Sequence, residues 1–135
     1  MKKGNSKRKQ GFTIIELMIV LSILAILLAL AYPSYVDYVR KGKRGEAQQM
    51  LMNWAVNQEI WRSNHATYAD ADDIGPPTSD YYTFGVVDGS VSAISYTLQA
   101  NAQNDQSKDK ARNGTSCATL TLDQNGLKSP PDCWE

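Results

Sequence analysis

The residue that most needs a chemical explanation is Glu16, a carboxylate inside an apolar run. It is the only charged residue from Phe12 to Ala31, in FTIIELMIVLSILAILLALA. A carboxylate at a bilayer centre costs on the order of 2.5 to 3.5 kcal/mol, and less near one end of the span. Either snorkelling toward the headgroups or pairing with a cation would lower that cost. No Lys or Arg lies between Gly11 and Arg40, but a cut after Gly11 would place an α-amine on Phe12, one helical turn from Glu16 or available to a neighbouring chain.

The two cysteines, Cys117 and Cys133, form the second candidate pair. With the single His65 they do not supply four ligands at a zinc spacing, so no metal site and no cofactor are expected. An even pair in a small domain favours a disulfide in an oxidising compartment. His65 lies in an expected loop and is interpreted as a solvated side chain. No G-x-S-x-G, phosphate loop or metal-ligand cluster is present, so the sequence does not indicate an enzyme.

A short basic cluster, Lys108, Lys110 and Arg112, could bind a polyanion such as DNA. Asp105 and Asp109 interleave with it, and residues 45–135 hold five bases against twelve acids. The whole chain of 135 residues has 14 bases and 14 acids, so its neutrality arises by cancellation between separate blocks. We therefore favour a solvated loop over a DNA-binding stripe at this cluster.

The apolar run itself is long enough to position Glu16 in a membrane. Residues 12–31 would span roughly 30 Å as a helix, the thickness of a bilayer's hydrocarbon core. A secretory signal peptide would be shorter and would end in a small-x-small cleavage site. Five bases precede the run and four follow it, so charge alone barely orients it. The cysteines favour an extracytoplasmic C-terminal part and a cytoplasmic N-terminus.

Helical spacing continues beyond the run and then gives way to strand patterns. Pro33 predicts a kink, because it removes one backbone hydrogen bond and clashes with the carbonyl of Ala29. Ser22, Ala25 and Ala29 form a small-residue seam on which another helix could pack. An apolar stripe then predicts an amphipathic helix whose tryptophans pack in the core; its members are Ala47, Met50, Leu51, Trp54 and Trp61. Alternation and turn signals predict antiparallel strands at 81–87, 95–102 and 117–122, with a short fourth strand at 127–128.

The string Lys9-Gln10-Gly11-Phe12-Thr13-Ile14-Ile15-Glu16-Leu17 closely resembles the class III signal of type IV pilins and related pseudopilins. The resemblance implies cleavage between Gly11 and Phe12 by a prepilin peptidase, N-methylation of Phe12, and use of Glu16 to recruit and register subunits. It also implies an α+β fold, the type IV pilin fold. In that fold a long N-terminal helix, half membrane-spanning and half amphipathic, packs on a small antiparallel sheet with a C-terminal disulfide loop closed by Cys117 and Cys133.

The implied organisation has three parts: a cleaved leader at 1–11, a membrane and filament-core half-helix at 12–39, and an extracytoplasmic head at 40–135. The implied function is that of a type IV pilus subunit, most similar to PilE-type minor pilins, in pilus assembly, adhesion and twitching motility. Its expected partners are other pilin subunits, prepilin peptidase and the inner-membrane assembly machinery. Two alternatives stay open: a type II secretion pseudopilin, which often has a calcium site in place of the terminal disulfide, and a minor pilin that binds DNA or another ligand.

Overall fold

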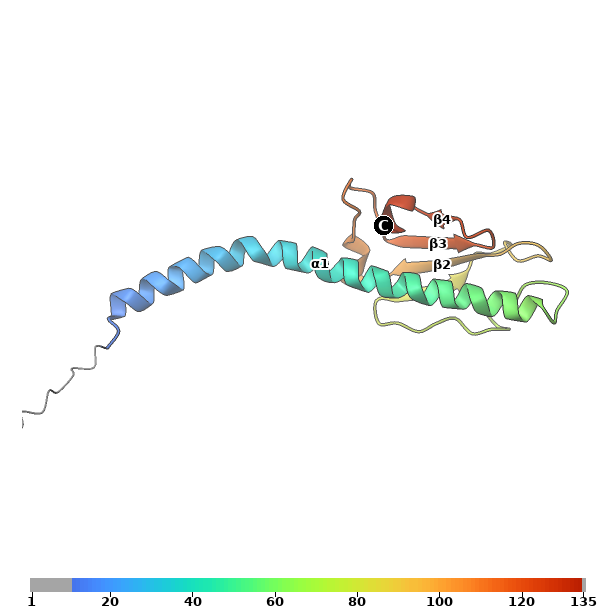
Figure 1. Cartoon of the computed structure of the whole chain (residues 1–135), viewed down its shortest axis with the longest axis horizontal. Coiled ribbons are helices and arrows are strands. Elements are labelled where there is room, and N and C mark those ends of the chain that lie inside the picture. Colours follow the sequence, from blue (N-terminus) through green and yellow to red (C-terminus); the bar gives the residue numbers. More distant parts are fainter. Residues whose placement is uncertain (1–10, 135) are drawn as a thin grey trace, which may run out of the picture. The chain divides into compact units, whose positions relative to one another are not determined.

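The structure, a computed structural model, describes residues 11–134 of the chain (Figure 1). It divides into two compact units, with the boundary between Val36 and Asp37. Residues 1–10 of the predicted leader lie outside the described residues. The elements in chain order are α1 (Ile14–Arg62), β1 (Tyr82–Val86), β2 (Thr97–Ala102), the 3-10 helix η1 (Asn104–Lys108), β3 (Thr119–Asp123), β4 (Lys128–Ser129) and the 3-10 helix η2 (Pro131–Trp134).

The first unit consists of the N-terminal half of α1. The helix begins at Ile14 because the Thr13 hydroxyl accepts a hydrogen bond from the Glu16 backbone N–H at 3.2 Å, which satisfies one of the free donors of the first turn. Every large apolar side chain from Ile14 to Leu30 is exposed, and the helix is long and apolar enough to cross a membrane. The helix continues through Pro33, and the kink expected there stays a prediction.

The second unit is the head, in which the rest of α1 packs against the sheet (Figure 1). The predicted apolar stripe is confirmed for Ala47, Leu51 and Trp54, which are buried in the core. Core packing of Trp61 was a wrong expectation. Its ring is only half-buried, because it stacks on His65 of the loop that follows the helix, with ring centroids 3.7 Å apart.

The sheet has four antiparallel strands in the order β1-β2-β3-β4, as the strand patterns predicted. Leu98 in β2 lies opposite Leu122 in β3, and Ala100 lies opposite Leu120. All four side chains are buried, which is the alternation expected when one face of a sheet covers a core.

Strands β2 and β3 each begin two residues later than predicted, because groups outside the ladder bind the backbone that precedes them. Strand β2 begins at Thr97 rather than at Ser95, since the Ser92 hydroxyl accepts a hydrogen bond from the Ser95 N–H at 2.9 Å. Strand β3 begins at Thr119 rather than at Cys117, since the Cys117 N–H donates to the Asp109 carbonyl at 2.9 Å. Local side-chain and loop hydrogen bonds thus compete with strand pairing at both places.

The disulfide between Cys117 and Cys133 is present, with Cα atoms 5.6 Å apart, which confirms the predicted pairing. Both cysteines are fully buried. The bond joins the segment before β3 to η2, so it closes the C-terminal loop onto the core.

Candidate functional site

The residues of the predicted processing site lie at the exposed start of α1. Gly11 and Phe12 are exposed and precede the first helical residue, and Glu16 is exposed in the first turn. Within residues 11–134, no cation forms an ion pair with Glu16. The processing roles of Gly11 and Phe12 and the assembly role of Glu16 stay predictions.

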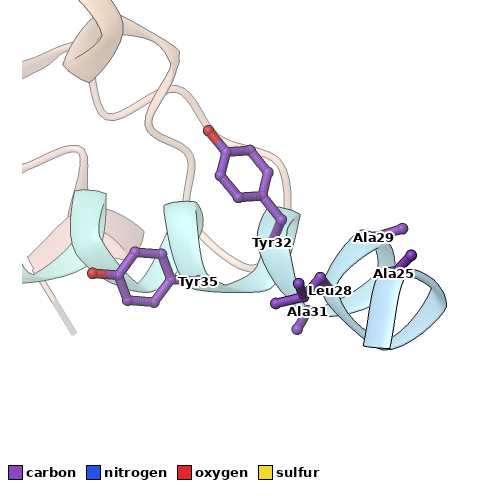
Figure 2. A pocket seen from close by; sticks show the side chains of 6 residues that line it. All are labelled: Ala25, Leu28, Ala29, Ala31, Tyr32 and Tyr35. Atoms are coloured by element: carbon purple, nitrogen blue, oxygen red, sulfur yellow. The ribbon is translucent and has the colours of Figure 1, made fainter. Parts of the chain in front are cut away.

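A shallow apolar hollow of about 820 Å³ lies along the N-terminal half of α1 (Figure 2). Ala25 and Ala29 of the predicted small-residue seam belong to it, whereas the third member, Ser22, turns its hydroxyl to the Met18 carbonyl at 2.8 Å. The small side chains leave space that the larger neighbours border. The residues lining the hollow are Ala25, Leu28, Ala29, Ala31, Tyr32 and Tyr35.

In the head, residues 104–110 form a strap that is bound along α1. Asp105 accepts from Arg40 at 2.7 Å, and Asp109 accepts from Arg44 at 2.9 Å. The Gln106 side-chain amide donates to the Arg40 carbonyl at 2.9 Å. The two arginines are one helical turn apart and the two aspartates are also four residues apart, so the ion pairs form successive rungs between helix and strap.

The rung between Arg44 and Asp109 is buried, with side chains only 5% and 4% exposed. The same Arg44 Nη1 also lies 3.0 Å from the Cys117 sulfur. Burial raises the pKa of Asp109, and the nearby Arg44 charge opposes that rise. A buried charge loses its hydration, so each partner needs the other to stay in the interior.

The solvated surface predicted at Lys108, Lys110 and Arg112 does not extend to the two neighbouring residues Gln106 and Asp109. Asp109 and Gln106 are buried, whereas Lys108, Lys110 and Arg112 are exposed as expected. The only signal in the sequence was the matching four-residue spacing of the arginines and the aspartates.

The strap also places Lys108 beside Arg40 of α1, which is far from it in the sequence. Lys108 pairs with Asp105 at 3.1 Å, beside the Arg40 contact with the same carboxylate. Arg40 and then Lys108 lower the pKa of Asp105 through their hydrogen bonds, which keeps that carboxylate ionised. We keep the name basic cluster for the three exposed bases of this segment, Lys108, Lys110 and Arg112.

His65 does not join a constellation of reactive groups. Its ring is stacked on Trp61, and its Nδ1 lies 2.9 Å from the Trp61 carbonyl. Among residues 11–134, no three His, Cys, Asp or Glu side chains are close enough to hold a metal ion.

Comparison with known proteins yields two family matches and one structural match. Residues 6–32 match the prokaryotic N-terminal methylation motif. Residues 33–121 match the family described as type IV minor pilin ComP, DNA uptake sequence receptor. A type IV pilin from Shewanella oneidensis is similar in structure, with a TM-score of 0.56 and 30% sequence identity, over 71% of this chain and 98% of that chain. No curated protein sequence matches the chain significantly.

Proposed function

The chain belongs to the type IV minor pilin family, and on that premise we propose how it is processed, stored and used. It is a type IV pilus subunit with an N-terminal methylation motif. We propose that prepilin peptidase cuts between Gly11 and Phe12 and that Phe12 is then N-methylated. Before assembly the subunit is stored in the inner membrane with its head in the periplasm, and the assembly machinery then moves it into the fibre.

The observation that carries this proposal is the exposed apolar half of α1. From residue 14 to residue 35 the helix has one charged side chain, Glu16, and its large apolar side chains are exposed. Exposed apolar surface of this extent is unfavourable in water, at roughly 25 cal/mol for each Å². Lipid covers it in the precursor, and neighbouring helices cover it in a fibre.

Cleavage also gives Glu16 a nearby cation, whereas residues 12–39 contain no Lys or Arg. Residues 1–11 carry five of the 14 bases, and their removal creates an amine on Phe12. The helix begins at Ile14, after the Thr13 cap, so Phe12 lies outside it. The new amine can therefore pair with the carboxylate of Glu16 in the same chain or in a neighbouring chain. We propose that the pairing in trans sets the register of subunits in the fibre.

Intact-mass and N-terminal analysis of the protein from membranes and from sheared surface fibres tests the processing. We expect a chain that begins with methylated Phe12 in the fibre fraction. The matched control is the same strain without the peptidase, in which the chain should begin at Met1 and stay in the membrane. A chain that still begins at Met1 in fibres of the normal strain would refute the proposal.

The role of Glu16 is tested by Glu16→Ala, with Glu59→Ala as a control at an exposed carboxylate in the head. We expect Glu16→Ala to be cleaved normally and yet to be lost from fibres, because only the mature pairing is removed. Normal incorporation of Glu16→Ala would remove its assigned role.

Capture of duplex DNA is a second candidate function. It is favoured by two observations: the matched family is described as a DNA uptake sequence receptor, and the strap places Lys108 beside the Arg40 turn of α1. Lys41, Lys110 and Arg112 are exposed and make no ion pair within the described residues, so they are available to phosphates. The acidic remainder of the head explains why the sequence alone favoured the opposite interpretation.

Gel shift of the full chain in detergent with duplex DNA, at about 50 and 200 mM salt, tests the DNA proposal. We expect binding that weakens with salt and a shallower salt dependence for Lys110→Gln. Lys128→Gln is the control, because Lys128 lies in β4 outside the basic cluster. Binding that is absent, or equally affected by both variants, would exclude the basic cluster as the DNA site.

A further inference from the structure

One carboxylate on the strap binds two cations that come from different parts of the chain. Asp105 Oδ2 accepts from two nitrogens of Arg40, Nη2 at 2.7 Å and Nε at 3.2 Å. Its other oxygen, Oδ1, lies 3.1 Å from Lys108 Nζ. The side chains of Asp105 and Lys108 are 60% and 71% exposed. Arg40 and Lys108 therefore converge on a single anionic group at the surface of the head.

The same two cations are a suitable ligand set for a phosphate group. The arginine fork matches two acceptor positions on an anion, and the lysine adds a point charge. A carboxylate has one negative charge, as a phosphate of the DNA backbone has, and it offers oxygen acceptors of the same kind. The other carboxylate on Arg40, that of Asp37, binds a different nitrogen, Nη1, at 3.1 Å. Within the described residues, Asp105 alone thus occupies the Nε and Nη2 side of the fork.

The strap has contacts to α1 that do not involve Asp105. Asp109 pairs with Arg44 in the interior. The side-chain amide of Gln106 donates to the Arg40 carbonyl at 2.9 Å, in a half-buried place. The ion pairs of Asp105 are instead exposed, and exposed pairs are weak because water and salt compete for both charges. Asp105 can therefore release its two cations while the strap stays bound to the helix.

We propose that Asp105 blocks part of the DNA-binding surface, because it holds Arg40 and Lys108 until a backbone phosphate of duplex DNA takes its place. Lys110 and Arg112 need no such exchange, since they make no ion pair within residues 11–134. Each phosphate that binds at Arg40 or Lys108 must first break an existing pair, so DNA affinity is lower than the number of bases would give. Asp105 thus lowers the affinity without touching DNA. This inference rests on the proposed capture of duplex DNA.

The first test compares Asp105→Asn with Asp88→Asn in the full chain in detergent. Both variants remove one negative charge, but Asp88 is exposed and forms no ion pair in the described part of the chain. Affinity for fluorescent duplex DNA is measured by anisotropy at several salt concentrations. We expect Asp105→Asn to bind about three- to tenfold more tightly than Asp88→Asn, the size of effect that two exposed ion pairs have. Its log affinity should also fall more steeply with log salt, by about 0.9 for each phosphate gained.

The second test leaves Asp105 unchanged and compares two lysines of the strap. Lys108→Gln should weaken DNA binding less than Lys110→Gln, because Lys108 must leave Asp105 before it meets a phosphate. In the Asp105→Asn background the two losses should become equal. An affinity of Asp105→Asn no higher than that of Asp88→Asn, or equal losses for the two lysine variants with Asp105 present, would overturn the inference alone. Absence of binding in every variant would refute the proposed capture of DNA as well.

Discussion

The buried ion pair between Arg44 and Asp109 gives the sharpest stability prediction. Arg44→Met removes the cation and leaves a carboxylate that is 4% exposed without its partner. Breaking a buried pair in this way costs about 3–5 kcal/mol, a large part of the 5–15 kcal/mol that holds a typical domain folded. The loss also removes the guanidinium contact to the Cys117 sulfur at 3.0 Å. We therefore expect Arg44→Met to lower the head's free energy of unfolding by about 3–5 kcal/mol.

The pair Arg44→Met and Asp109→Leu, made singly and together, completes the design. Replacing both charges with apolar groups removes the need for either partner, so the double variant should recover most of the lost stability. The free energy of unfolding is measured for the full chain in detergent by guanidinium titration, followed by tryptophan fluorescence because Trp54 is in the core. A cost below about 1 kcal/mol for Arg44→Met would show that water reaches the pair, and the argument for a buried rung would be wrong.

Three further predictions concern the rest of the head. Replacing both Cys117 and Cys133 with serine should lower the free energy of unfolding by about 3 kcal/mol, because the disulfide closes a loop with a sequence separation of 16 and so restricts the unfolded chain. An unchanged midpoint in a guanidinium titration would contradict this prediction. Gln58→Leu should lower the free energy of unfolding by about 2 kcal/mol or more, because the Gln58 side chain hydrogen-bonds both the N–H and the carbonyl of buried Ala69. The control is Gln49→Leu on the exposed surface, and equal unfolding midpoints for the two variants would refute the role of Gln58. Burial raises the pKa of Tyr96 from 10.0 to about 12, so its contribution to stability is complete below pH 10 and is lost as the pH rises through about 12. When tyrosinate formation is followed by absorbance, the step at the highest pH should be missing in Tyr96→Phe. An unchanged titration would refute the assignment.

Most of the secondary structure could be predicted from local patterns. The apolar run and the stripe through Leu51 and Trp54 predict α1, and alternation predicts the strands, because burial of one face imposes a period on the residues next to it. Trp61 fits the same period but does not pack in the core, because its ring stacks on the ring of His65, which lies outside the helix. Periodicity indicates which way a side chain points, but not what it meets there.

The sequence by itself determined three features: the processing motif, the membrane-length helix and the cysteine pairing. The first two depend on residue types at short spacing, and two cysteines allow a single pairing within one chain. The ion pairs that bind the strap to α1 could be found only from the tertiary structure. Arg44 and Asp109 are 65 positions apart, and each looks like a solvated charge until the folded chain brings them to 2.9 Å in a buried place. The energy of a charge depends on its distance from a partner and on its access to water, and both quantities exist only once the chain is folded.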